Sequence, residues 1–242
     1  DILYKVSVEG VLGTTSNAVS GIYFDSRDVK LDSLYVAQKG ELLDGHDFIS
    51  QAIDNGAKTI VCEEFPIVLV DGIVYVLVLN SSEALGTIAS NFYDNPSEKM
   101  ILVGVTGTNG KTTIATLLYE LFLREGFMTG LLSTVKIAYG YKKFENYHTT
   151  PDAVTLNKYL HKMLDAGVSH CFMEVSSHGI DQNRIKGLVF SGGIFSNLSH
   201  DHLDYHQDFK TYRDVKKLFF DSLPKTAFAL INLDDKNGKY ML

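Results

Sequence analysis

The pattern of hydrophobic and polar positions in the first hundred residues predicts a small α/β domain. Short apolar runs of strand length alternate with helical apolar spacing over residues 46–55. Strands are predicted over residues 22–24, 33–37 and 57–62. A helix from Ser81 to about Tyr93 comes next, and Asn95-Pro96-Ser97 then breaks the chain. We therefore place this N-terminal α/β domain over residues 1–97.

Two further apolar runs in this region predict a β-hairpin. Residues 67–70 and residues 73–79 are both apolar, and Asp71-Gly72 stands between them. An Asp-Gly pair favours the tight turns with positive φ that connect antiparallel strands. The two runs are therefore predicted to pair with each other.

From residue 98 onward, predicted strands and helices alternate along the chain. Residues 101–105 form an unbroken apolar run, as expected of a strand that is covered on both faces. Further strands are predicted over 127–133, 171–175, 190–195 and 227–231, and helices over 112–125, 150–166 and 209–223. This alternation predicts an α/β domain with a doubly wound, mostly parallel sheet over residues 98–242. Because the last strand lies so near Leu242, we expect this domain to be truncated.

Composition and charge exclude several classes of protein. The 242 residues include 22 Lys plus Arg against 29 Asp plus Glu, and the net charge of −7 argues against a nucleic-acid partner. No apolar run is long enough to cross a bilayer, so no membrane partner is expected either. Cys62 and Cys171 lie far apart inside apolar runs, which predicts buried thiols. We expect a cytoplasmic monomer.

The strongest chemical signal is a glycine-rich loop between a predicted strand and a predicted helix. Residues 104–113 read Gly-Val-Thr-Gly-Thr-Asn-Gly-Lys-Thr-Thr. Glycines let backbone N–H groups surround phosphate oxygens, and the following helix directs its positive end at them. Lys111 would neutralise the β- and γ-phosphates, and the Thr112 hydroxyl would bind Mg²⁺. The general pattern has a glycine where Val105 stands, and the alternative is an ordinary glycine-rich turn.

Two other segments carry candidate metal ligands. Residues 199–206 read Ser-His-Asp-His-Leu-Asp-Tyr-His, a density of histidines and carboxylates that suggests a metal site. Surface histidines are the alternative for this segment. Glu174 ends a predicted strand, at the edge where open α/β sheets bind ligands. Next to a phosphate loop its carboxylate would suit Mg²⁺, and a solvated strand-end residue is the alternative.

Lys216 has an unusual position in the helix predicted over residues 209–223. It lies four residues after Tyr212 and three before Phe219, inside the apolar stripe, whereas Lys217 lies on the polar side. A lysine on an inward face must reach solvent, form an ion pair, lose its charge or be modified.

In their number and order, these segments resemble the Mur ligase family, with nearly the whole chain covered. The shared motifs are the phosphate loop and residues 148–152, 174–178, 195–198, 201–206 and 232–235, with residues 25–27 and 44–46 in the first domain. The resemblance is strongest to ligases that extend UDP-N-acetylmuramoyl-L-alanyl-D-glutamate. Two departures are mild: Ser196 stands where threonine is more usual, and Ser199-His200 precede Asp201.

The resemblance implies an ATP-dependent acid–amino-acid ligase of peptidoglycan precursor synthesis. ATP would phosphorylate the D-glutamate side carboxylate, and the amine of L-lysine or meso-diaminopimelate would displace phosphate from the acyl phosphate. Residues 1–97 would bind the UDP-linked precursor and residues 98–242 would bind ATP. The family's third domain, which selects the amino acid, is expected to lie outside this chain, so the chain alone would be incomplete for activity.

The resemblance also implies roles for individual residues. ATP would be bound by Gly107, Thr108, Asn109, Gly110, Lys111, Thr112 and Thr113. The catalytic residues would be Lys111, Glu174, His202 and Lys216. Mg²⁺ would be held by Thr112, Glu174, His202 and Lys216, the lysine having become a carbamate by reaction with CO₂. The substrate would be bound by Ser26, Thr149, Thr150, Ser176, Gln182 and Arg184.

Three other functions remain open at this point. A folylpolyglutamate synthetase shares the phosphate loop and the modified lysine but usually lacks an N-terminal domain like residues 1–97. The chain could also bind ATP and the precursor without turnover. A metallo-hydrolase built on His200, His202 and His206 would need neither Lys111 nor Lys216.

Overall fold

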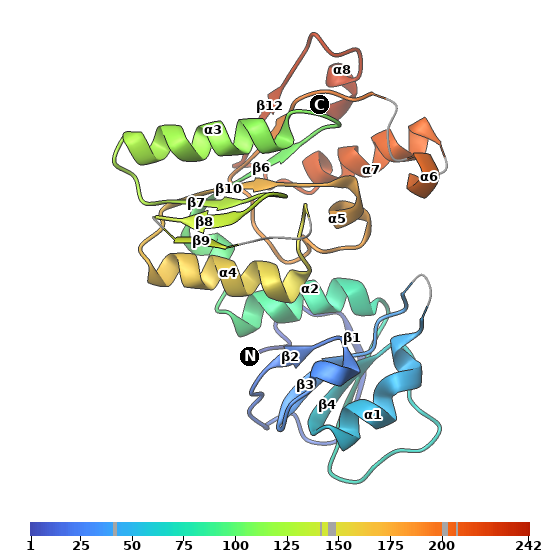
Figure 1. Cartoon of the computed structure of the whole chain (residues 1–242). Coiled ribbons are helices and arrows are strands. Elements are labelled where there is room, and N and C mark those ends of the chain that lie inside the picture. Colours follow the sequence, from blue (N-terminus) through green and yellow to red (C-terminus); the bar gives the residue numbers. More distant parts are fainter. Residues whose placement is uncertain (41–42, 141, 145–148, 200–202, 207) are drawn as a thin grey trace. The chain divides into compact units, whose positions relative to one another are not determined.

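The computed structural model describes residues 1–40, 43–140, 142–144, 149–199, 203–206 and 208–242 (Figure 1). Contacts divide the chain into two compact units, Asp1–Phe92 and Tyr93–Leu242. The division therefore precedes the expected boundary at residue 97. The reason is that the short 3-10 helix η3 (Pro96–Lys99) packs in the second unit, where the buried Ser97 hydroxyl accepts a hydrogen bond from Val189 N at 3.0 Å.

The first unit contains a five-stranded sheet of order β1-β5-β4-β3-β2. Its strands are β1 (Val8–Leu12), β2 (Ile22–Tyr23), β3 (Ser33–Val36), β4 (Ala57–Cys62) and β5 (Val74–Val78). All neighbours are parallel except β1, which runs antiparallel to β5. The helices are α1 (Ile49–Asp54) and α2 (Ser81–Phe92), with 3-10 turns at Ser26–Asp28 and Gly45–Phe48. Tyr35, Ile60 and Tyr75 are buried in the core.

The prediction of a β-hairpin with its turn at Asp71-Gly72 is wrong. The turn forms, with Gly72 at a φ of +80°, but residues 67–70 form no strand, and the side chains of Ile67 and Val68 are exposed. Strand β5 instead pairs with β1 on one edge and with β4 on the other. Both edges of β5 are thus occupied, and the apolar run before it has no strand to join.

The second unit is built on a seven-stranded sheet of order β12-β11-β6-β10-β7-β8-β9 (Figure 1). Its strands are β6 (Ile101–Thr106), β7 (Thr129–Leu132), β8 (Ile137–Tyr139), β9 (Lys142–Phe144), β10 (His170–Glu174), β11 (Gly192–Phe195) and β12 (Phe228–Ile231). The pairs from β12 to β7 are all parallel, and β8 and β9 add an antiparallel edge. The prediction of a doubly wound, mostly parallel sheet is confirmed.

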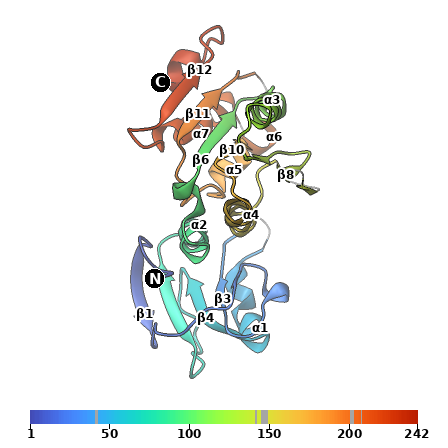
Figure 2. The ribbon, with the colours of Figure 1, turned by 90° about the vertical axis from the view of Figure 1, so that its left-hand side faces the viewer.

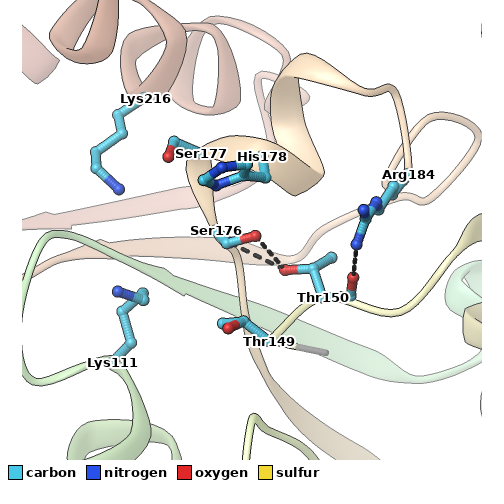
Figure 3. Close-up of a pocket in the computed structure, with 8 residues that line it drawn as sticks. All are labelled: Lys111, Thr149, Thr150, Ser176, Ser177, His178, Arg184 and Lys216. Atoms are coloured by element: carbon cyan, nitrogen blue, oxygen red, sulfur yellow. Dashed lines mark hydrogen bonds between the residues drawn. The ribbon is translucent and has the colours of Figure 1, made fainter. Parts of the chain in front are cut away.

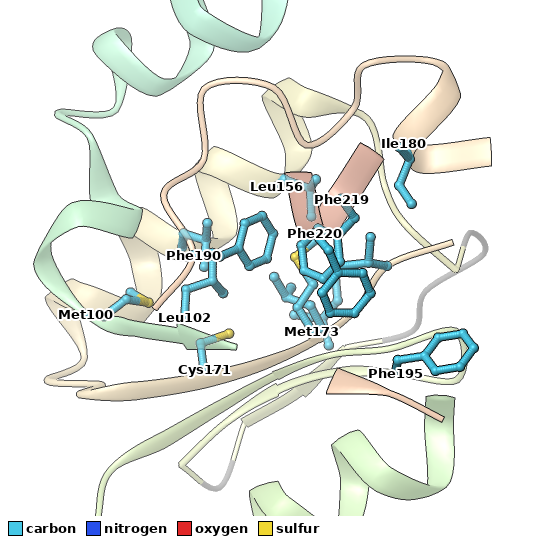
Figure 4. Close-up of a cluster of buried hydrophobic side chains, with 14 of the residues drawn as sticks. Met100, Leu102, Leu156, Cys171, Met173, Ile180, Phe190, Phe195, Phe219 and Phe220 are labelled. Atoms are coloured by element: carbon cyan, nitrogen blue, oxygen red, sulfur yellow. The ribbon is translucent and has the colours of Figure 1, made fainter. Parts of the chain in front are cut away.

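Helices cover both faces of this sheet (Figures 1 and 2). Helix α3 (Lys111–Arg124) packs on the face to which β6 presents Val103 and Val105. Helices α4 (Ala153–Asp165) and α7 (Phe209–Asp221) pack on the opposite face around Leu102 and Phe219 (Figure 4). The remaining helices are the short α5 (Ser177–Asp181), α6 (Leu203–His206) and α8 (Gly238–Met241). Among the described residues, no helix has the length and apolarity needed to span a membrane.

Two glycines in adjacent strands set the distance between α7 and the sheet. Gly104 of β6 lies opposite Gly193 of β11 in the parallel register. A Cβ at Gly104 would lie 2.5 Å from Phe219 Cζ, and one at Gly193 would lie 2.9 Å from Phe219 Cε1. Because neither glycine carries a side chain, the Phe219 ring can pack directly on the strands. Lys216, three residues earlier on α7, is thereby brought near the end of β6.

Candidate functional site

Three adjacent parallel strands of the second unit end at the same edge of the sheet. The register pairs Glu174 of β10 with Val105 of β6, and Phe195 of β11 with Thr106. Strand β6 leads into residues 107–110 and then α3, and β11 leads into Ser196. The glycine-rich loop, the Glu174 carboxylate and the segment after β11 therefore lie side by side.

The segment after β11 holds the glycine-rich loop in place. Thr108 N donates to Asn197 O at 2.8 Å, and Asn109 N donates to Asn197 Oδ1 at 3.0 Å. Gly107 has a φ of +146°, and a Cβ there would collide with Ser196 Oγ, so only glycine fits. Val105 is buried inside β6, so the valine that departs from the general pattern lies outside the loop itself.

The N-terminus of α3 faces this loop without a side-chain cap. Gly110 is the N-cap residue in the left-handed conformation, and no side chain of the described residues caps the helix there. The first N–H groups of a helix have no partner within it, and they carry the positive end of its dipole. This arrangement suits an anion such as a phosphate.

Two lysines converge on the carbonyl group of Gly107. Lys111 Nζ donates to the carbonyl oxygens of Gly107 and Thr108, at 2.9 Å each. Lys216 Nζ donates to Gly107 O at 3.1 Å, and this side chain is only 1% exposed. The inward position predicted for Lys216 is confirmed, whereas Lys217 forms an ion pair with Asp221.

Glu174 is buried, and its carboxylate lies beside the first turn of α3. Thr112 Oγ1 donates to Glu174 Oε2 at 3.0 Å, so two of the four predicted Mg²⁺ ligands are in direct contact. Thr134 N donates to Oε1 at 2.8 Å, and Thr134 Oγ1 donates to Oε2 at 3.1 Å. Sequence reasoning missed Thr134. It follows the carboxyl end of β7, so the rule that pointed to Glu174 could have found it.

The predicted histidine site is only partly described. His200 and His202 lie outside the described residues. His206 is described, and its side chain is buried rather than placed on the surface. Within the described residues, no group of three or more His, Cys, Asp or Glu side chains converges in a way that could hold a metal ion.

A pocket of about 280 Å³ lies beside the two lysines (Figure 3). Its lining residues are Lys111, Thr149, Thr150, Ser176, Ser177, His178, Arg184 and Lys216. All of them were predicted as site residues except Ser177 and His178, which follow Glu174 in the motif at residues 174–178. In Figure 3 the Lys111 and Lys216 ammonium groups lie on one side of the pocket and Arg184 on the other.

Most of the predicted substrate residues form one hydrogen-bonded network. Ser176 N donates to Thr150 Oγ1 at 3.0 Å, and the two hydroxyl oxygens also lie 3.0 Å apart. Arg184 Nη1 donates to Thr150 O at 2.7 Å, while Nε and Nη2 donate to Gln182 Oε1 at 3.0 and 2.6 Å. Ser26 belongs to the first unit, where its hydroxyl donates to Gln51 Oε1 at 2.6 Å.

Residues after β12 hold the segment after β11. Asp235 Oδ2 accepts a hydrogen bond from Leu198 N at 2.9 Å, and Oδ1 accepts one from Asn237 N at 2.8 Å. Asn232 Nδ2 donates to Ser196 O at 2.7 Å. Burial raises the pKa of the Asp235 carboxyl, but hydrogen bonds from the Leu198 backbone and from the backbone and side chain of Asn237, together with the charge of Lys236, outweigh it and leave the pKa below its ordinary value.

Models of known protein families match most of the chain. The sequence matches the family described as "Mur ligase middle domain" over residues 105–242 and "Mur ligase family, catalytic domain" over residues 18–93. The chain belongs to the Mur ligase family. The resemblance seen in its motifs is therefore confirmed.

Relatives within the Mur ligase family are close in sequence. The chain is 56% identical over 243 residues to the UDP-N-acetylmuramoyl-L-alanyl-D-glutamate--2,6-diaminopimelate ligase of Cytophaga hutchinsonii, covering 100% of the chain and 50% of that protein. It is 51% identical to the ligase of the same name from Phocaeicola vulgatus, covering 99% and 50%. A solved structure of a ligase with this name is similar with a TM-score of 0.78 and 27% identity, covering 95% and 47%. The chain thus spans about half the length of the curated relatives it matches.

Asp235→Asn should make the Mur ligase chain less stable near neutral pH but not in acid. Because the folded-state pKa of Asp235 is lowered, its stabilisation is fully present above the unfolded-state pKa of about 3.9 and disappears as the pH falls through the folded-state value. Urea unfolding of both proteins across this range measures the difference in free energy. A difference that stayed constant at every pH would contradict the assignment.

Proposed function

We propose that this chain supplies the ATP-binding and precursor-binding parts of a ligase that adds 2,6-diaminopimelate to UDP-N-acetylmuramoyl-L-alanyl-D-glutamate. The observation that carries the proposal is the meeting of the glycine-rich loop, Glu174 and Lys216 at one sheet edge. The names of the most similar curated relatives support 2,6-diaminopimelate rather than L-lysine as the added amino acid. We further propose a cytoplasmic monomer without membrane or nucleic-acid partners.

The phosphates of ATP would lie against residues 107–113 at the N-terminus of α3. The helix N–H groups and the Lys111 ammonium are the positive groups that support this placement. Lys111 now bonds to two neutral carbonyl oxygens. A phosphate oxygen would replace them with a stronger, charge-assisted hydrogen bond.

Thr112 and Glu174 would hold Mg²⁺ next to these phosphates. A hydroxyl and a carboxylate supply the hard oxygen ligands that Mg²⁺ prefers, and their 3.0 Å contact fits two ligands of one ion. The ion, when bound, would neutralise phosphate charge. His202 is proposed as a further ligand from its place in the family motif.

The acceptor carboxylate of the precursor would occupy the pocket between the lysines and Arg184. Arg184, Thr150 and Ser176 offer guanidinium and hydroxyl groups to orient it. Its oxygen would attack the γ-phosphorus of ATP, and ADP would leave. The amine of the diamino acid would then attack the acyl carbon and lose a proton to solvent, and phosphate would leave as the amide bond forms. Gln182 would act by holding the Arg184 guanidinium. Ser26 would contact the uridine end of the precursor.

Lys216 would work as a carbamate. In its neutral form the amine would add to the carbon of CO₂, an N–C bond would form, and a proton would pass to solvent. The burial of Lys216 supports this proposal, because burial favours the neutral form of an amine, which is the form that reacts with CO₂. The product is an anion on the wall of the pocket, where it could attract Mg²⁺.

Lys111→Ala should weaken binding of a non-hydrolysable ATP analogue with Mg²⁺ by about 10- to 150-fold. Loss of one hydrogen bond to a charged group costs about 1.5–3 kcal/mol. Isothermal titration calorimetry on the chain measures the affinity. Lys217→Ala is the matched control, because Lys217 is paired with Asp221 on the surface of α7, and it should bind like the unaltered protein. Equal affinities for all three proteins would refute the phosphate-loop assignment.

Lys216 should carry a carbamate when the chain is equilibrated with ¹³C-bicarbonate. A carbamate carbon signal is expected in the unaltered chain and in Lys217→Ala, and it should be lost in Lys216→Ala. In a full-length ligase, short carboxylic acids should restore part of the activity that Lys216→Ala removes, because they can occupy the vacated position. A signal that survived Lys216→Ala would assign the modification to another residue and contradict the proposal.

A further inference from the structure

Tyr212 connects α7 to the glycine-rich loop. It lies one helical turn before Lys216, and its side chain is fully buried. Its hydroxyl oxygen is 3.1 Å from Thr108 Oγ1, and the centroid of its ring is 4.7 Å from Lys216 Nζ. We propose that Tyr212 is a positioning residue that fixes Thr108, and with it the phosphate loop, against α7. This inference rests on the proposed nucleotide site.

The Thr108 hydroxyl also contacts the segment after β11. Ser199 N donates to Thr108 Oγ1 at 3.0 Å, and Thr108 Oγ1 lies 3.3 Å from Ser199 O, which can only accept. A hydroxyl group has one hydrogen and two acceptor lone pairs. In the contact between Thr108 and Tyr212, either hydroxyl can be the donor. Thr108 therefore joins the loop to α7 and to the segment after β11.

Consecutive turns of α7 hold consecutive residues of the loop. Tyr212 contacts Thr108, and Lys216, four residues later on the same helix face, donates to Gly107 O. The Lys216 contact depends on the chemical state of that amine, which changes in the proposed function. The Tyr212 contact is neutral and does not depend on it. Tyr212 would therefore keep the loop in place for phosphate binding whether or not Lys216 is modified.

Tyr212→Phe removes the hydroxyl and keeps the ring that packs beside Lys216. In the nucleotide-free chain, we expect this change to shift the amide NMR signals of Thr108 and Ser199. Tyr119→Phe is the matched control, since Tyr119 is a buried tyrosine of the same unit whose hydroxyl donates to Gly140 O at 3.0 Å, outside the loop. It should leave both signals in place. Unchanged signals in Tyr212→Phe would overturn the inference.

A double-mutant cycle tests whether Tyr212 acts on nucleotide binding through Thr108. Tyr212→Phe should weaken binding of the ATP analogue with Mg²⁺ by about 2- to 10-fold, the effect of one neutral hydrogen bond. In a Thr108→Val background, Tyr212→Phe should have no further effect. An equal loss in both backgrounds, or the same loss in Tyr119→Phe, would overturn the inference. If the unaltered chain bound no nucleotide, the proposed function would fail, while the amide signals would still decide the contact.

Discussion

The parallel pairing of β6 with β10 and β11 is the constraint on which the site depends. Parallel neighbours end at the same sheet edge, and here the register places Glu174 opposite Val105 and Phe195 opposite Thr106. The backbone thus brings the carboxylate and the glycine-rich loop together before any side chain makes contact. The same register aligns Gly104 with Gly193, whose lack of side chains lets Phe219 and α7 approach. The sheet therefore sets the positions of both the acidic and the basic groups.

Charge couples the two lysines at the glycine-rich loop. The Lys111 and Lys216 ammonium groups both donate to Gly107 O, so two like charges stand close together where Lys216 is buried. Repulsion between like charges is stronger where the local dielectric constant is low. A phosphate bound at the loop would be attracted to Lys111. Conversion of Lys216 to an anion would change its interaction with Lys111 from repulsion to attraction.

Sequence predicted the features that depend on local spacing. Periodicity gave β4 and the inward position of Lys216, and the glycine-rich loop was found from its residues alone. The failures concern pairing between distant segments. An Asp71-Gly72 turn cannot reveal that β5 pairs with β1 and β4. Thr134 could have been listed as a strand-end residue, but its local sequence does not reveal that β7 lies beside β10 and hence that Thr134 meets Glu174. The substrate roles of Ser26 and the other predicted contacts stay predictions, and His202 lies outside the described residues.

A crystal structure of the chain with a non-hydrolysable ATP analogue and Mg²⁺ would show whether the glycine-rich loop binds phosphate and whether Thr112 and Glu174 hold the ion. Phosphate density is expected along residues 107–113, with Lys111 Nζ moved from the Gly107 carbonyl to a phosphate oxygen. Mg²⁺ is expected to be bonded to Thr112 Oγ1 and to the Glu174 carboxylate. Nucleotide bound away from this loop, or Mg²⁺ bound without Glu174, would contradict the account.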